Sequence, residues 1–445
     1  MGKEKGAVRF LPAAICALAL ALPCAGQSPQ QGQTPQQDMG GMPMPQGPAG
    51  TLEGEVLQHG GSGTSVDPNS SAAPMLMTMR GGWMLMLHGV AFVVSQQQAG
   101  PRGVDKVFSS NWAMGMAQRD AGPGTVTLRA MLSLEPATIS GRYYPELFQV
   151  GETAFGRPIV DGQHPHNFFM ELAAMYDVRV GEHALISFYG APVGDPALGP
   201  PAFPHRASAD ENPLAVLGHH LQDSTHISGS VFTLGAAYRW VRVEASGFHG
   251  REPGENRWTI PAGAVDSWAG RLTVNPLPNW SIQYSIGRLH SPEAISPQED
   301  TLRMTASLDY HRAFARADWA SIVVWGRNKS LPDGEVLNSY LLESRLRFLE
   351  RNAVWTRIEN VDRTTELLLA GQPAPPGFEE RFLARIQAYS LGYDRDILVT
   401  RRTRTAIGAQ VTIYGVPGSL RPVYGDVPAG VAAFVRFRPG ENQRR

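Results

Sequence analysis

Two short loops hold five of the twelve histidines in the chain. Imidazole is a common ligand for zinc, copper and nickel, and three or four converging imidazoles can hold an ion. A nearby carboxylate can add an oxygen ligand, or it can orient a histidine through its second ring nitrogen. Copper and zinc are the ions we consider. The candidate metal ligands are His164, His166, His219, His220, His226, Asp161 and Asp223.

The same histidines have a structural interpretation. Neither His164-Pro165-His166 nor His219-His220 is a compact metal-binding motif by itself. Histidines in long loops also hydrogen-bond to loop backbone and fold the loop onto the protein beneath it. The sequence leaves both interpretations open.

A hydrolase is a third interpretation. Ser224 lies next to Asp223 and close to His219 and His226. A catalytic triad, however, is assembled from separate segments, and the chain has no Gly-x-Ser-x-Gly nucleophile motif. We therefore predict that the protein is not an enzyme.

Each histidine loop leads directly into a segment where apolar and polar residues alternate, at 168–176 and at 228–238. A period of two is typical of a β-strand with different surroundings on its two faces. The alternation recurs from residue 82 onward, and glycine and proline are spread throughout without a long helical pattern. The predicted fold class is all-β.

We predict a transmembrane antiparallel β-barrel of about sixteen strands, with short turns and long loops alternating as in bacterial outer-membrane barrels. Short turns are expected at 121–124 and 350–352, and long external loops at 136–167 and 191–226. A soluble propeller would show a repeat of about 40 to 50 residues, which the sequence lacks. The predicted strand centres are Leu87, Met114, Leu128, Ala174, Ile186, Leu234, Val243, Leu272, Tyr284, Ser307, Val323, Leu342, Thr356, Ile386, Ala409 and Val435.

One face of these strands is charged and must avoid lipid, because an arginine at the membrane midplane costs about 2–4 kcal/mol. Such a lumen fits an open pore or a barrel plugged by ion pairs, and about sixteen strands usually leave a channel, so we favour the pore. The expected lumen residues are Arg129, Glu171, Asp177, Arg179, Arg242, Glu244, Arg303, Asp309, Arg345, Arg347, Arg357, Glu359 and Arg385. The expected aromatic girdle is Trp83, Trp112, Tyr176, Tyr189, Tyr238, Trp280 and Tyr340.

The N-terminus has the pattern of a secretory signal peptide: a basic start, an apolar run at 10–22 and small residues at Ala25 and Gly26. Cleavage there would remove Cys16 and Cys24, the only cysteines, and with them any disulfide or thiolate site. The predicted organisation is a signal peptide at 1–26, a disordered Gln/Gly/Pro/Met-rich periplasmic linker at 27–80, the barrel at 81–438 and a polar tail at 439–445.

Methionines are concentrated in the predicted linker. Met39, Met42 and Met44 lie within six residues, and Met75, Met77 and Met79 stand just before the first predicted strand. Thioethers are soft ligands that suit Cu(I). The alternative is a flexible tail in which the methionines bind nothing.

Two blocks, Asp-Gly-Gln-His-Pro-His-Asn-Phe-Phe-Met-Glu-Leu from Asp161 and Gly-His-His-Leu-Gln-Asp-Ser-Thr-His-Ile-Ser from Gly218, carry a resemblance. They resemble an uncharacterised family of Gram-negative outer-membrane β-barrel proteins with Met- or His-rich N-terminal segments. The resemblance implies a porin-like fold and a link with copper or heavy-metal resistance.

The predicted function is a porin-like channel in the cell outer membrane that passes small polar solutes or metal ions, with a His-rich metal-binding outer vestibule. The alternative is a metal-binding or structural surface protein that transports nothing. The expected partners are outer-membrane lipid and a small polar solute or metal ion, and a homotrimer is one expected assembly. A net charge of −1 gives no reason to expect nucleic acid.

Overall fold

A computed structural model of the chain describes residues 50–71, 75–294, 296–364 and 383–440. The predicted signal peptide, residues 27–49 of the predicted linker and residues 441–445 of the predicted tail lie outside the described residues. The description below concerns one of two compact units, Pro43–Gln443.

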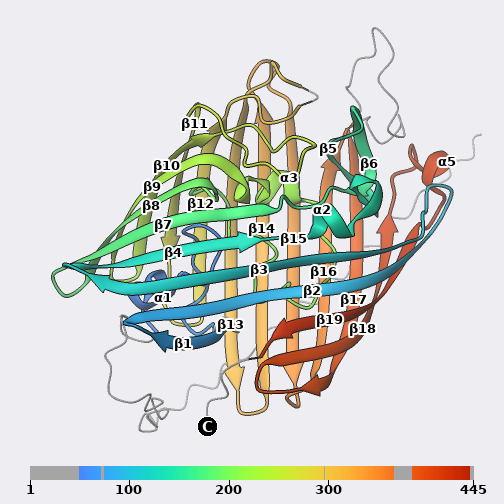
Figure 1. Ribbon diagram of the computed structural model, residues 1–445. Coiled ribbons are helices and arrows are strands. Elements are labelled where there is room, and N and C mark those ends of the chain that lie inside the picture. Colours follow the sequence, from blue (N-terminus) through green and yellow to red (C-terminus); the bar gives the residue numbers. More distant parts are fainter. Residues whose placement is uncertain (1–49, 72–74, 295, 365–382, 441–445) are drawn as a thin grey trace, which may run out of the picture. The chain divides into compact units, whose positions relative to one another are not determined.

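Within the described residues, sixteen strands pair antiparallel with their neighbours, and β19 pairs with β2 to close the ring (Figure 1). All sixteen predicted strand centres lie inside these strands, which confirms the β-barrel prediction. The strands of the ring are β2 (Trp83–Ala99), β3 (Lys106–Ala121), β4 (Gly124–Leu132), β7 (Phe169–Val180), β8 (Ala184–Gly194), β9 (Ser228–Tyr238), β10 (Val241–His249), β11 (Ser267–Val274), β12 (Trp280–Leu289), β13 (Thr301–Phe314), β14 (Ala317–Ser330), β15 (Val336–Phe348), β16 (Asn352–Arg363), β17 (Ala384–Val399), β18 (Thr403–Gly415) and β19 (Ala429–Pro439).

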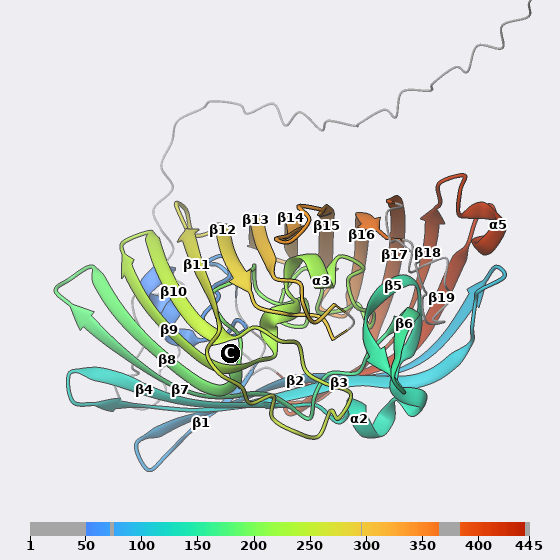
Figure 2. The same cartoon turned by 90° about the horizontal axis from the view of Figure 1, so that it is seen from above.

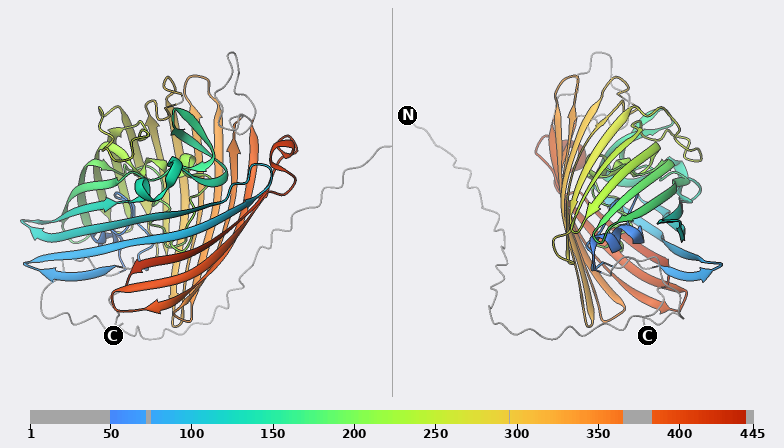
Figure 3. Two further views of the ribbon diagram at one scale, coloured as in Figure 1. Left: turned by 45° about the vertical axis from the view of Figure 1, so that its right-hand side comes forward. Right: turned by 90° about the vertical axis from the view of Figure 1, so that its left-hand side faces the viewer.

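Strands on opposite sides of the ring cross at a large angle, which is the tilt that closes a barrel (Figure 3). Large apolar side chains such as Phe232, Leu391 and Val243 are exposed on the outward face, as a lipid-facing surface requires. Of the predicted girdle, Tyr238 and Tyr340 are exposed outside the ring. No helix among the described residues is long and apolar enough to cross a membrane.

The prediction is wrong for Trp112 and Tyr189, which are buried. Trp112 shares its face of β3 with the buried Met114, and Tyr189 donates a hydrogen bond to buried Glu171 at 2.6 Å. Their positions follow strand parity, because alternate residues of a strand point to opposite faces.

Short turns join the strands at one end of the ring, and the long connections lie at the other end. The connection from β4 to β7 contains α2 (Glu135–Thr138), η1 (Ser140–Arg142) and a hairpin of β5 (Tyr144–Ala154) and β6 (Arg157–Gln163). The connection from β8 to β9 contains α3 (His219–Gln222) and η2 (Ser224–His226). It is almost wholly buried, and α3 lies inside the ring (Figure 2). A short helix α5 (Arg421–Tyr424) precedes β19.

Part of the predicted disordered linker is ordered: it contains α1 (Leu52–Gln58) and β1 (Leu76–Arg80). The side chain of Thr51 caps α1 by accepting a hydrogen bond from the Gly54 amide. Leu52, Val56 and Leu57 pack in a cluster with strand residues Leu185 and Ala237. The segment has too little apolar surface to fold alone, and the barrel wall supplies its partner.

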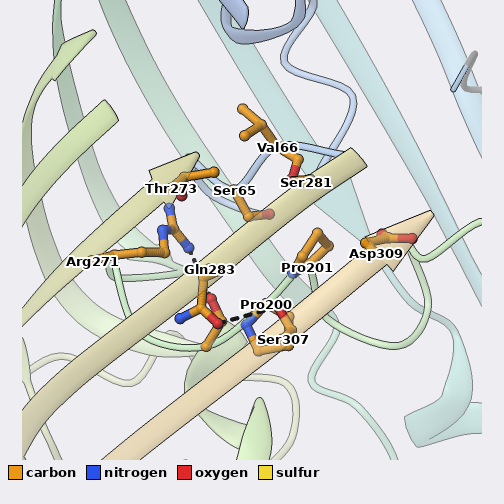
Figure 4. A pocket seen from close by; sticks show the side chains of 11 residues that line it. Ser65, Val66, Pro200, Pro201, Arg271, Thr273, Ser281, Gln283, Ser307 and Asp309 are labelled. Carbon is orange, nitrogen blue, oxygen red and sulfur yellow. Dashed lines mark hydrogen bonds between the residues drawn. The ribbon is translucent and has the colours of Figure 1, made fainter. Parts of the chain in front are cut away.

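After α1 the chain continues inside the ring through turns and irregular structure. Arg129 of β4 donates hydrogen bonds to the carbonyls of His59 and Gly61, at 2.8 and 3.0 Å. Arg271 of β11 donates to the hydroxyl of Thr64. Residues 65–66 and 199–201 line a cavity of about 10 Å³, room for one water, together with residues of β11, β12 and β13 (Figure 4).

Most of the predicted lumen residues are buried, so their orientation is confirmed; Arg179 and Arg385 are exposed exceptions. Many of the buried charges are paired, for example Arg271 with Glu244 and Arg357 with Glu343, each at 2.8 Å. Of the two interpretations of this lumen, the burial supports one filled by ion pairs and by two inward segments, 50–71 and 195–227.

Replacing Arg129 by glutamine should destabilise the barrel. The change removes donors from the carbonyls of His59 and Gly61, and it removes the guanidinium that pairs with buried Glu171 at 2.7 Å. We expect a loss of about 3–5 kcal/mol in the free energy of unfolding, measured by urea titration in detergent. Arg119→Gln, an exposed arginine one strand away, should change it by less than about 0.5 kcal/mol; equal effects would contradict the account.

Candidate functional site

The outer half of the lumen brings the two histidine loops together. His164 and His166 follow β6, and His219, His220 and His226 lie on α3 and η2. The carbonyl of His220 accepts hydrogen bonds from Arg303 of β13 and Asn328 of β14, at 2.7 and 3.0 Å. Because both residues lie near the long-loop end of their strands, these bonds fix α3 to the outer part of the wall.

All five predicted histidines form one buried group, which we call the histidine cluster: His164, His166, His219, His220 and His226. The ring centroids of His219 lie 5.3 Å from His220 and 5.2 Å from His226. His164 lies 5.5 Å from His220, and His166 lies 5.4 Å from His226. His220 and His226 therefore contact the first loop, and His219 lies between them; Phe203 packs against the His219 ring at 5.4 Å.

In each ring of the histidine cluster, Nδ1 faces an acceptor. It contacts a carboxylate in three rings: Asp223 at 2.6 Å from His219, Glu252 at 3.3 Å from His220, and Glu135 at 3.0 Å from His166. It contacts backbone carbonyls in the others, that of Asp223 at 2.9 Å from His226 and that of Pro165 at 3.1 Å from His164. A backbone carbonyl and an ionised carboxylate can only accept a hydrogen bond. Nδ1 of each ring therefore carries the proton, and Nε2 of a neutral ring holds a free lone pair.

The Nε2 atoms of the histidine cluster differ from the Nδ1 atoms in their hydrogen bonding. Among the described residues, Nε2 of His166, His220 and His226 is buried without a hydrogen-bond partner. Nε2 of His164 lies 3.1 Å from a carboxylate oxygen of Glu152, but without hydrogen-bond geometry. Buried polar atoms are normally satisfied, so a group of unpartnered lone pairs requires an explanation.

Asp223 is the residue that ties the cluster to the wall. Its two oxygens contact Nδ1 of His219 and Nη1 of Arg206, which is in turn paired with Glu343 of β15 at 2.9 Å. Burial alone would raise the pKa of Asp223, but His219 and Arg206 together hold that pKa well below its usual range. Asp223 thus orients a histidine, which is one of the two roles predicted for it.

Burial, reinforced by His219 and His166, lowers the pKa of His226 to about 3. Burial and the neighbouring His220 likewise hold the pKa of His164 well below its ordinary value. These rings are therefore neutral at pH 7, which is the form that binds a metal.

The structure does not bring Asp161 to the cluster. Its carboxylate pairs with Arg102 at 2.7 Å and accepts hydrogen bonds from the amide of Phe148 and the hydroxyl of Tyr424. It holds the β5–β6 hairpin to the neighbouring loops.

Among the described residues, Ser224, the candidate hydrolase nucleophile, is not hydrogen-bonded to an imidazole. Its hydroxyl donates to Glu252 and accepts from Arg303.

Sequence reasoning missed Glu135, Glu152 and Glu252, the carboxylates beside the cluster. They lie far from the histidines in the chain, on α2, on β5 and after β10. Their position in long outer connections was a signal in the sequence that they could lie near the cluster. It did not distinguish them from other acidic loop residues.

As they stand, no three His, Cys, Asp or Glu side chains of the described residues form a group that could hold a metal ion. The distances between ring centroids nevertheless match those of two histidines that share a metal ion. An ion about 2.1 Å from Nε2 lies about 3.2 Å from the ring centre, so two rings at a tetrahedral angle have centroids about 5 Å apart. The rings of the cluster would therefore have to rotate to bring their Nε2 atoms onto one point.

An open pocket of about 450 Å³ lies over this region. Its lining includes Pro165, which separates the two histidines of the first loop, and Arg257, which pairs with Glu152. The pocket therefore borders the first histidine loop at Pro165.

No known protein family matches the chain, and no curated protein matches its sequence. Solved structures similar to it include an anion-selective porin from Comamonas acidovorans, 10% identical with a TM-score of 0.46, which covers 80% of this chain and 99% of the porin. OmpF of Salmonella typhi in complex with daunomycin is 10% identical with a TM-score of 0.46, over 81% of this chain and 100% of OmpF. The outer-membrane channel DcaP of Acinetobacter baumannii is 8% identical with a TM-score of 0.43, over 81% and 99%. Likenesses this distant carry no inference about what the chain binds or passes.

Acid should destabilise the folded protein through the histidine cluster. The folded pKa of His226, about 3, lies below the unfolded value of about 6.5, so its contribution is present above pH 6.5 and is lost as pH falls toward 3. Unfolding should take up one more proton in wild type than in His226→Gln over pH 4–6, a slope of about 1.4 kcal/mol per pH unit. Equal slopes in urea titrations of the two proteins would contradict this.

Proposed function

We propose that this protein is an outer-membrane barrel that binds a divalent transition-metal ion in its histidine cluster and passes ions or small polar solutes under the control of its inward segments. The observation that carries the proposal is the group of buried Nε2 atoms without hydrogen-bond partners, each in a ring whose Nδ1 is already held. This is the arrangement that outer-shell partners give to metal-binding histidines.

The surroundings favour a divalent ion such as Zn²⁺ or Cu²⁺. Imidazole suits both ions. Asp223, Glu252 and Glu135 lie directly behind the rings and offset the charge of such an ion without binding it. A role limited to holding the loops explains the Nδ1 contacts but not the buried Nε2 atoms.

The filled lumen bears on transport. Residues 50–71 and 195–227 cross the path that an open pore would use, so passage requires that one of them moves. The second candidate function, a surface protein that binds metal and transports nothing, is favoured by the same burial. A measurement of single-channel conductance distinguishes these two functions.

Purified, detergent-folded protein should bind Zn²⁺ or Cu²⁺ with a stoichiometry of at least one. Replacing His164, His166, His219, His220 and His226 by alanine should abolish this binding in calorimetric titrations, because it removes every candidate nitrogen. His183→Ala with His290→Ala, two histidines outside the cluster, is the matched control. Binding that survives the five changes would refute the proposed site.

A milder variant keeps all five candidate histidines and changes only a carboxylate that holds one of their rings. Glu252→Gln leaves an acceptor for Nδ1 of His220 but removes the negative charge behind the ring. We expect the affinity for Zn²⁺ to fall by about 10- to 100-fold with the fold intact. An unchanged affinity would argue that His220 is not a ligand.

Deleting residues 50–71 should raise single-channel conductance in planar bilayers from a low or intermittent level to a steady porin-like level. The reason is that the segment lies in the lumen against Arg129 and Arg271. Heat-modifiable gel migration checks that the variant still folds. A folded variant without conductance would favour the alternative that transports nothing.

A further inference from the structure

A second group of potential ligands lies on another part of the inner wall. Eight of the fifteen methionines belong to one cluster, six of them buried on β2, β3, β4 and β7, and two partly buried at the start of β1. They are Met75, Met77, Met84, Met86, Met114, Met116, Met131 and Met170. The other buried apolar clusters of the described residues contain a single methionine, Met175, so the methionine content of this cluster is distinctive.

Strand register arranges these side chains in rows across the wall. Met77 pairs with Met86, and Met86 pairs with Met116. Two residues further along β2, His88 pairs with Met114, which in turn pairs with Met131. Directly opposite residues on neighbouring strands have Cβ atoms about 4.5–5.5 Å apart, so the side chains in each row are in reach of one another.

Methionine is also an ordinary filler of apolar cores, and the cluster includes Val193, Ile227 and Trp112. Core filling, however, requires no histidines. His88 and His205 lie at the row that contains Met114 and Met131, and they are only 8% and 9% exposed. Nδ1 of both rings is buried without a hydrogen-bond partner within the described part of the chain.

His205 connects this row to the inward connection between β8 and β9. Its Nε2 lies 3.2 Å from the sulfur of Met131, and its ring lies 6.2 Å from that of His88. Trp112 packs against both rings at 4.8 Å. Two imidazoles therefore contact one indole, the thioether of Met131 contacts one of these imidazoles, and strand register places Met114 beside His88 and Met131. All four residues are buried.

We propose that His88, Met114, Met131 and His205 form a second metal site, selective for a soft monovalent cation of the Cu(I) class. Thioethers bind soft ions, and imidazole completes such sites. All four ligands are uncharged, which suits an ion of charge +1. The histidine cluster, backed by carboxylates, suits a divalent ion instead, so the two sites differ in the charge they accept.

The methionine rows also provide a path along which an ion reaches the second site. Met84 and Met86 begin β2 at the end of the ring where the short turns lie, and Met114 and Met131 stand further inside. Successive inward residues of a strand are about 7 Å apart, so an ion can pass from one thioether row to the next. The wall of β1, β2, β3 and β4 that carries them is the blue and cyan part of Figure 1.

Ag⁺, added as the nitrate in chloride-free buffer, tests this site because it is soft, monovalent and stable to oxidation. Wild type should bind at least one equivalent, and Met114→Leu with Met131→Leu should weaken that binding at least tenfold. Leucine keeps the apolar volume, so folding is expected to survive. Met175→Leu with Met304→Leu, outside the rows, is the matched control and should bind as wild type does.

The two proposed sites can fail separately. The variant that lacks the histidine cluster should lose Zn²⁺ binding and keep Ag⁺ binding, whereas the double leucine variant should do the reverse. X-ray absorption of wild type loaded with Ag⁺ should show sulfur neighbours. Absence of Ag⁺ binding in wild type, equal binding in the leucine variant, or nitrogen and oxygen neighbours alone would overturn the second site.

Discussion

The constraint on which this structure depends is that charged groups on the inner face of a membrane barrel must be paired. Arg206, Arg242, Arg303, Arg345 and Arg436 are all fully buried. A buried charge without its partner costs several kcal/mol, so a paired arginine fixes the segment that carries its partner. Arg206 shows this best, because it lies between Glu343 on the wall and Asp223 in the inward connection. Through Asp223 the wall determines where His219 lies.

The same pairing explains why loops rather than strands carry the site. Strand residues alternate between lipid and lumen, and a single strand presents one inward side chain about every 7 Å. The histidine cluster needs rings 5.2–5.5 Å apart, which two connections from different parts of the chain supply. Glu252 comes from a further outer connection, between β10 and β11, so three long loops contribute to one buried centre.

The barrel could be predicted from the sequence because strand parity is local: alternation within eight or nine residues places Leu128 outside and Arg129 inside. The grouping of His164 and His166 with His219, His220 and His226 was also predicted from their loops. Asp161 was misplaced, because its partners Arg102 and Tyr424 come from distant segments that no local pattern relates. The order of residues 50–71 was missed for the same reason, since the groups that hold them, such as Arg129 and Arg271, belong to the wall.

We propose that the buried Nε2 atoms of the histidine cluster bind one ion. The most direct measurement is anomalous diffraction at the zinc edge from crystals of the wild-type protein grown with Zn²⁺. The account predicts one strong peak among the rings of the histidine cluster, within about 2.1 Å of at least three Nε2 atoms. A lumen without a peak, or zinc found only at exposed histidines such as His290, would contradict it.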